Sequence, residues 1–321
     1  MRILSPVFPR FIPPKTPEGT TGFMAGQDAI LGFSFSGDTV QVVEIVYGEP
    51  RSTIHAMDEF ANVFSNKDYS NQDVENFSTS ISRFMKAFGV KSREASVALD
   101  SGTLFMNTIP MDTDLSQSEV NEHINWELTQ FFPEQSPRSF INDIHVLNES
   151  AQENIREVLT VSVLRAQADA IQKALSRIGI SLNIVDVDHF SAETALRVNY
   201  PDTTTKYLGL VGVKRNRLDV SLLRKGVLES YSYYAVESNQ DIVERIGILS
   251  REIKGIYSIV AYGPHLEKDL LAQIRRGSSM LVEALNPLRH VEVSETLNLA
   301  ENLTVPSYRF ASAVGVALRR D

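Results

Sequence analysis

Several polar residues in this sequence have types and spacings that could bind an anion or a metal ion. The basic turn Lys214-Arg215-Asn216-Arg217 could hold an anion, although such a cluster is more often a solvated surface. Asp186 and Asp188 lie two residues apart at the end of a predicted strand, where alternation points both carboxylates the same way, and a structural role is favoured over acid–base chemistry. The six histidines show no paired helical spacing and the chain has no cysteine, which argues against a metal centre.

Two strand hairpins position these turns. The first joins its strands through Ser36-Gly37-Asp38, and the second joins them through the basic turn. A third strand follows each hairpin after a glycine. The strands are predicted at residues 30–35, 39–45 and 51–57, and again at 208–213, 218–223 and 227–235. Strand 30–35 is expected to be buried on both faces and strand 39–45 to be half exposed. Two such meanders predict a duplicated α/β architecture.

Amphipathic patterns with start and stop signals predict the helices that cover these strands. They are expected at residues 73–88, 116–132, 166–178, 190–199, 239–254 and 266–276, with a final helix that ends at residue 318. Inside the first of the two predicted halves, residues 95–178 read as a small αβ insert with its own strands and helices. No Gly-x-Ser-x-Gly, Walker or dinucleotide fingerprint is present.

Composition limits the possible partners and the compartment. The chain has 321 residues, of which 43% are apolar, and its net charge of −9 disfavours general binding to nucleic acid or to an anionic membrane. No apolar run approaches about 18 residues and no secretory leader is visible, so a cytoplasmic location is expected. Residues 1–28 are rich in proline and are expected to be a flexible extension, or else a docking segment for a partner or a neighbouring copy.

The order of several short segments resembles the type IV pilus assembly protein PilM family, which belongs to the actin-like and FtsA-like ATPase superfamily. The segments are Leu31-Gly32 with Val42-Val43-Glu44-Ile45, Ile124-Asn125-Trp126-Glu127, Phe131-Phe132-Pro133, Val187-Asp188 with Phe190, Asn286-Pro287-Leu288, and the stretch from Phe310 to Arg319. The resemblance implies an actin-like fold of two ribonuclease-H-like halves. It places the first half at 29–94 and 179–203, the insert at 95–178, and the second half at 204–321. A small lobe of the second half is expected to be missing.

The family resemblance also implies that this chain is a degenerate member with a vestigial nucleotide pocket. ATP chemistry in the superfamily needs glycine-bearing hairpin turns for the phosphates and carboxylates for Mg²⁺. Here Ser34 and Leu210 stand at the two carboxylate positions. The remaining residues of the expected pocket are Ser36, Gly37, Gly212, Lys214 and Gly263. No cofactor, no metal and no enzymatic activity are therefore expected; the alternative is an ATP-binding protein or ATPase with substituted metal ligands.

As a PilM-like protein, the chain is expected to be a non-catalytic scaffold at the inner membrane. The resemblance implies a cytoplasmic tail of an inner-membrane pilus or secretion protein, PilN-like, bound as an extended peptide between the first half and the insert. A strand edge and the helix carrying Trp126 would face one another there, with Phe131, Phe132 and Pro133 completing the partner site. The alternative for Phe131 and Phe132 is that they belong to the core. A further alternative is the cytoplasmic domain of a type II secretion L-type protein. A homo-oligomer is possible, and any membrane contact would be through the partner.

Overall fold

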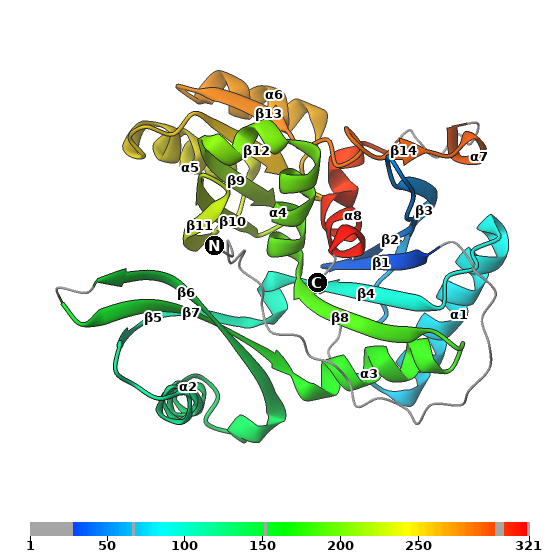
Figure 1. The fold of residues 1–321 in the computed structure, drawn as a ribbon, viewed down its shortest axis with the longest axis horizontal. Helices are drawn as coiled ribbons and strands as arrows, with labels where there is room; N and C mark the ends of the chain where they lie inside the picture. Colours follow the sequence, from blue (N-terminus) through cyan, green and yellow to red (C-terminus); the bar gives the residue numbers. More distant parts are fainter. Residues whose placement is uncertain (1–27, 66–67, 151–152, 299–304, 320–321) are drawn as a thin grey trace.

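The computed structural model describes residues 28–65, 68–150, 153–298 and 305–319, and in these residues the strands form three sheets (Figure 1). The six-stranded sheet has the order β14-β3-β2-β1-β4-β8. Its strands are β14 (Glu292–Val293), β3 (Thr53–Ala61), β2 (Thr39–Val46), β1 (Ala29–Ser36), β4 (Glu94–Leu99) and β8 (Ser181–Val187).

The five-stranded sheet repeats the plan of the six-stranded one. Its order is β11-β10-β9-β12-β13, from strands β11 (Val227–Ala235), β10 (Arg217–Arg224), β9 (Tyr207–Val213), β12 (Ser258–Tyr262) and β13 (Leu281–Ala284). In both sheets an antiparallel meander is followed by a strand that pairs in parallel with the first strand of that meander, β4 with β1 and β12 with β9. The duplicated architecture expected from the sequence is therefore confirmed.

Local sequence signals account for most of the helices. A serine N-cap whose side chain is paired with an acidic residue three positions later starts three of them, and this capping box satisfies free N–H groups at the helix start. The helices longer than one turn are α1 (Asn71–Phe88), α2 (Gln117–Phe131), α3 (Arg165–Ser176), α4 (Asp188–Asn199), α5 (Asn239–Glu252), α6 (Lys268–Gly277) and α8 (Ala311–Leu318).

Helices α4 and α8 cross closely between the two large sheets, as Figure 1 shows. A Cβ atom on Gly315 of α8 would lie 1.7 Å from the carbonyl oxygen of Ser191 on α4, so only glycine allows this approach. Gly32 of β1 has a similar role, because a Cβ atom there would lie 2.2 Å from the carbonyl oxygen of Ala313. The crossing fixes the start of α4 at the junction of the two halves.

The third sheet, β5-β7-β6, forms the insert with α2 on one face. Its strands are β5 (Phe105–Asp112), β6 (Phe140–Ser150) and β7 (Ile155–Leu164). Successive residues of β7 point to opposite faces: Val158 packs with α2, whereas Leu159 and Val161 join the core of the five-stranded sheet. The insert therefore has its own small core and also packs on the second half.

Two expected boundaries were wrong. The insert does not extend over 95–178, because β4 pairs with β1 in the six-stranded sheet and α3 packs into the core of that sheet. The second half does not extend to residue 321, because β14 pairs with β3 and α8 packs on β1 and β2. Both errors arise because long-range pairing, which leaves no local signal, decides which sheet an element joins. The Pro-rich extension expected at 1–28 lies almost wholly outside the described residues.

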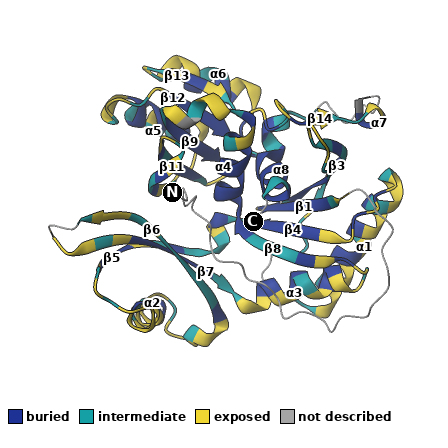
Figure 2. Cartoon of the chain, viewed as in Figure 1, coloured by how far each residue is buried: buried dark blue, intermediate teal, exposed yellow. Residues whose placement is uncertain are grey.

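Burial follows this architecture closely (Figure 2). Strands of the two large sheets and the helices α4 and α8 are mostly buried, while α2 and the free ends of β6 and β7 are mostly exposed. The expectation that β2 is half exposed was wrong, since Gln41 and Glu44 are both buried. Glu44 is satisfied there by the backbone N–H groups of Lys91 and Ser92 and by His55.

The expected absence of an extra lobe in the second half is confirmed for the described chain. β11 ends at Ala235 and α5 begins at Asn239, which leaves no room for a separate subdomain between them. Among the residues described, no helix combines the length and the apolar character that crossing a membrane requires.

Candidate functional site

The ammonium group of Lys214 is the centre of a buried charge cluster at the junction of the two halves. Its Nζ lies 2.8 Å from Asp100 Oδ1, 2.6 Å from Asp188 Oδ2 and 3.1 Å from Asp219 Oδ2. A lysine ammonium has three N–H donors, and three carboxylates surround this one. We call these four residues the Lys214 cluster.

Each member of the Lys214 cluster is supplied by a different element. Lys214 opens the turn between β9 and β10, and Asp219 lies on β10 in the second half. Asp100 directly follows β4 and caps the short 3₁₀ helix η1 (Ser101–Thr103), while Asp188 is the first residue of the crossing helix α4. The cluster therefore connects the ends of elements from both halves.

A second set of polar groups completes the coordination of the carboxylates. Asp219 Oδ1 accepts hydrogen bonds from Arg217 Nε at 2.8 Å and from the Tyr231 hydroxyl at 2.6 Å. Asp219 Oδ2 accepts one from the Ser101 hydroxyl at 2.6 Å. The backbone N–H of Ser101 donates to Asp188 Oδ1 at 3.1 Å. Because buried charges are costly unless paired and hydrogen-bonded, this coordination is what makes the cluster tolerable in the interior.

The pKa values follow from burial and from the neighbouring charges. Burial alone would lower the pKa of the Lys214 ammonium, but the three carboxylates outweigh it and raise that pKa well above the usual value. Burial opposes ionisation of Asp100 and Asp219 too, yet Lys214 holds the pKa of both below the ordinary range. For Asp188, burial together with the other two carboxylates outweighs Lys214 and raises the pKa to about 7.

The first hairpin turn takes part in the same arrangement. The backbone N–H of Gly37 donates to Asp100 Oδ2 at 2.9 Å, and the N–H of Gly102 donates to Asp100 Oδ1 at 2.9 Å. Asp100 therefore accepts a hydrogen bond from the backbone of the first hairpin turn and pairs with the Lys214 ammonium of the second. The donors that could bind a phosphate oxygen at these turns bind the Asp100 carboxylate instead. Ser34 and Ser36 are buried in β1 behind this turn.

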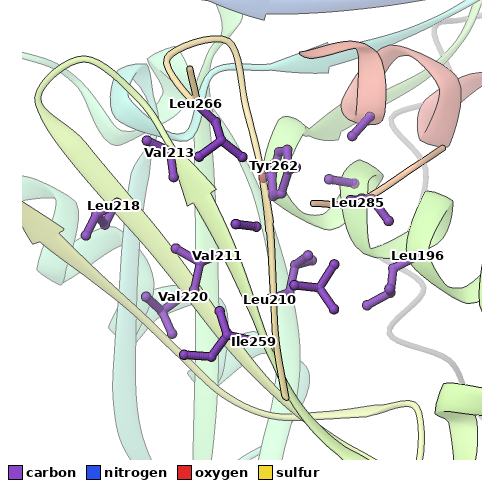
Figure 3. Close-up of a cluster of buried hydrophobic side chains, with 14 of the residues drawn as sticks. Leu196, Leu210, Val211, Val213, Leu218, Val220, Ile259, Tyr262, Leu266 and Leu285 are labelled. Atoms are coloured by element: carbon purple, nitrogen blue, oxygen red, sulfur yellow. The ribbon is translucent and has the colours of Figure 1, made fainter. Parts of the chain in front are cut away.

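Aromatic side chains occupy the space beside β9, the first strand of the second hairpin. Leu210, at the expected carboxylate position, is fully buried in the core shown in Figure 3. A Cβ atom on Gly212 would lie 2.8 Å from the Tyr262 hydroxyl oxygen and 3.1 Å from His189 Nδ1. Gly263, whose φ is +125°, packs its Cα against the backbone of Val213. Two of the three glycines expected in the pocket, Gly212 and Gly263, thus serve close packing.

His189 is buried between hydrogen-bonding partners and is not available for catalysis. Its two ring nitrogens lie 2.9 Å from the Tyr262 hydroxyl and 2.9 Å from Ser221 Oγ. Burial lowers the pKa of His189 to about 4, so the ring is neutral. Among the described residues, no group of three His, Asp or Glu side chains is arranged to hold a metal ion.

Sequence reasoning missed most of the Lys214 cluster. The preference for a solvated surface at the basic turn was wrong for Lys214, which is buried, although Arg215 is exposed as expected. Asp186 and Asp188 do not point the same way, because the strand ends at Val187 and Asp188 begins α4. Asp186 instead pairs with Arg319 at 2.5 Å and accepts from Ser191. Polar residues that directly follow strands, Asp100 and Asp188, were the signal that could have found the site.

The outer edge of β8 is a second candidate site. β8 ends the six-stranded sheet, so among the described residues no strand pairs with its outer side. Ile184 and Val185 are half-buried along it. Asp143 on β6 of the insert has a pKa raised to about 7, mainly by burial, and the carboxylate of Asp186 at the end of β8 adds to the rise. An unpaired edge strand is suited to binding an extended peptide.

The aromatic residues expected to complete that site lie elsewhere. Trp126 and Phe131 are both 56% exposed, while Phe132 is half-buried against Phe105 and Phe140 and Pro133 is exposed. Helix α2 lies apart from β8, on the face of the three-stranded sheet away from the second half (Figure 1). Trp126 therefore does not face the edge of β8, and its expected role in binding a partner stays a prediction.

Comparison with solved structures identifies the class of fold. The structure matches that of a PilM-PilN type IV pilus biogenesis complex with a TM-score of 0.70 and 14% identity, over 90% of this chain and 97% of that one. It matches a Bacteroides thetaiotaomicron protein described as having an actin-like ATPase fold and unknown function, with a TM-score of 0.50 and 12% identity, over 84% of this chain and 95% of that one. The fold is thus the actin-like fold.

The sequence then gives the family. Residues 32–235, more than half of the chain, match the family model described as type IV pilus assembly protein PilM. The chain belongs to this family. A comparison with curated proteins gave no match.

Proposed function

We propose that this protein is a cytoplasmic scaffold of a type IV pilus assembly that holds the cytoplasmic tail of an inner-membrane protein. Family membership supports the pilus role, and the similar solved structure is of a PilM-PilN complex. On this proposal the partner is PilN-like, and the chain associates with the inner membrane only through that partner.

The free edge of β8 is the observation that carries the proposal. An extended tail that adds to this edge gains main-chain hydrogen bonds, and its side chains can fill apolar positions beside Ile184 and Val185. Because backbone pairing is insensitive to side-chain identity, these apolar positions would supply the specificity.

We further propose that the protein works without ATP. The residues at the junction of the halves do not fit Mg²⁺ and a nucleotide: Leu210 offers no oxygen ligand, and Asp100, Asp188 and Asp219 are each paired with Lys214. The N–H of Gly37 is used by Asp100, and Tyr262 fills the space beside Gly212. When the residues of a site bind one another, the fold can persist although the site no longer binds its ligand.

The tail proposal is tested by calorimetry with a synthetic peptide. The peptide should carry the cytoplasmic tail of a PilN-like protein from the same type IV pilus system. We expect saturable binding to the intact protein, and we expect Ile184→Asp to weaken it by about tenfold or more, because a charge on a strand edge opposes strand addition.

The control variant is Leu281→Asp on β13, which places the same charge at an exposed apolar position on the edge strand of the other large sheet. This variant should bind the peptide as the parent chain does. Equal binding by the parent and by a folded Ile184→Asp protein would show that the tail does not use β8.

A further inference from the structure

The net charge of the protein is concentrated in the insert. Residues 105–164 contain ten Asp and Glu against two Arg and no Lys, which gives −8 of the total of −9. The remaining residues are therefore close to neutral. Helix α2 has three glutamates, Glu119, Glu122 and Glu127, and no Lys or Arg; His123 Nε2 lies 3.8 Å from Glu127 Oε1. Its C-terminal end, where the helix dipole is negative, adds to the same field.

Two aromatic side chains are exposed on this acidic helix. Trp126 and Phe131 are each 56% exposed, whereas the opposite stripe of α2, Val120, Ile124 and Leu128, is buried in the insert core. Glu122 lies one turn before Trp126 and is exposed, so a carboxylate stands beside the indole. Phe131 contacts Phe105, with their ring centroids 5.0 Å apart, and leaves its outer surface open.

Exposed tyrosines of the second half, in contrast, have cationic side chains over their rings. Tyr257 and Tyr233, which are exposed to a similar degree, have the cations Lys206 and Arg217 at 3.8 Å from their ring centroids. Three further tyrosines there also have an arginine over the ring. Within the described residues Trp126 has no such cation, and its only recorded ring neighbour is His123 at 5.9 Å. Indole is the strongest cation–π acceptor of the three aromatic rings.

We infer that the exposed face of α2 around Trp126 and Phe131 is a docking surface for a basic segment of a protein partner, one that carries arginine beside an apolar side chain. The arginine stacks on the Trp126 ring and pairs with Glu122, and the apolar side chain packs on Phe131. Charge complementarity selects this occupant, because an acidic field attracts a cationic segment and repels nucleic acid and anionic lipid. This surface is separate from the β8 edge.

The experiment uses the intact chain and a short peptide of alternating arginine and leucine. Trp126 is the only tryptophan, so a change of intrinsic tryptophan fluorescence on titration reports contact at this surface. We expect saturable binding that weakens as salt is raised, and no binding of the same peptide with glutamate in place of arginine. Binding of both peptides, or of neither, would overturn the inference.

Two variants locate the contact by calorimetry. Trp126→Leu keeps an apolar side chain and removes the aromatic face, and we expect it to weaken binding about two- to fivefold. Glu122→Gln should weaken it to a smaller extent. The matched control is Glu149→Gln on β6, which removes the same charge from the insert away from α2. Equal losses for Glu122→Gln and Glu149→Gln, with no effect of Trp126→Leu, would show that only the overall charge of the insert matters.

Ile184→Asp separates this surface from the tail site. Because β8 lies apart from α2, this variant should bind the arginine peptide as the parent chain does. A loss of arginine-peptide binding in that variant would place the peptide at β8 and overturn the assignment to α2.

Discussion

The Lys214 cluster and the outer face of α2 both combine acidic groups with aromatic rings, yet their charges are paired within the chain to very different extents. In the cluster, Lys214 and Arg217 neutralise the carboxylates and Tyr231 donates to Asp219. On α2, the glutamates have no Lys or Arg on their own helix, although His123 lies 3.8 Å from Glu127, and Trp126 is exposed. The carboxylates of the Lys214 cluster are paired within the chain, whereas the outer face of α2 is exposed to solvent.

Burial explains this difference. A charge removed from water costs several kcal/mol unless the chain supplies a partner, so the Lys214 cluster can exist only in a satisfied form. Charges on α2 remain hydrated and cost little without a partner. Unsatisfied recognition groups can therefore persist only at the surface, and it is there that binding partners are expected.

Removing the central cation should have the largest effect on the molecule. Lys214→Met leaves three buried carboxylates without their common partner, and we expect it to lower the free energy of unfolding by about 3–5 kcal/mol. Urea denaturation measures this. Arg215→Met, in the same turn but 84% exposed, is the control and should stay within about 0.5 kcal/mol of the parent. A folded Lys214→Met protein with parent-like stability would mean that the cluster is not what holds the halves together.

The cluster should also show in the pH dependence of stability. Folded Asp188 keeps its proton to about pH 7, whereas unfolded Asp188 loses it near about pH 4. The folded state thus binds the extra proton between these values, and Asp188 makes the free energy of unfolding fall as pH rises through that window. Asp188→Asn should flatten this fall. An unchanged slope between pH 4 and pH 7 would contradict the raised pKa.

Asp100 and Asp219 act in the opposite sense. Because their pKa values are lowered in the folded state, their contribution is present above about pH 4 and is lost as the pH falls below it. This loss of stability at acid pH should be unchanged in Asp188→Asn, so the acid side of the stability curve serves as an internal control.

The smallest effect on stability is expected on α2. Trp126→Ala should change the free energy of unfolding by no more than about 0.5 kcal/mol, because the side chain is more than half exposed. Leu128→Ala, on the buried stripe of the same helix, should cost about 2–5 kcal/mol. Thermal or urea unfolding distinguishes the two. Comparable losses would mean that Trp126 is part of the insert core.

Sequence patterns predicted the elements far better than their assembly. Both meanders and most of the helices were predicted because their signals are local, such as the glycine in the turn after β1 and the capping box at Ser116. The burial of β2 was missed because α8, which packs against it, comes from the other end of the chain. Element assignment failed for β4 and α8, where pairing with distant segments decides the sheet.

The candidate site was harder to predict for the same reason. Lys214 and Asp100 are 114 residues apart, and no local pattern relates them. The sequence showed that Leu210 and Ser34 stand at the positions where carboxylates were expected. It did not show that three other carboxylates surround Lys214. Exposure of Trp126 was suggested by the amphipathic pattern of α2, because it falls off the buried stripe. Its position away from β8 required the arrangement of the sheets.

The central claim is that the charged groups of the Lys214 cluster, between the two halves, are satisfied by the chain itself. Isothermal titration calorimetry of the intact protein with Mg-ATP tests this most directly, because a nucleotide would have to compete with Asp100 for the N–H of Gly37 and for Lys214. We predict no saturable binding at sub-millimolar concentrations. Saturable sub-millimolar binding of Mg-ATP would contradict the account.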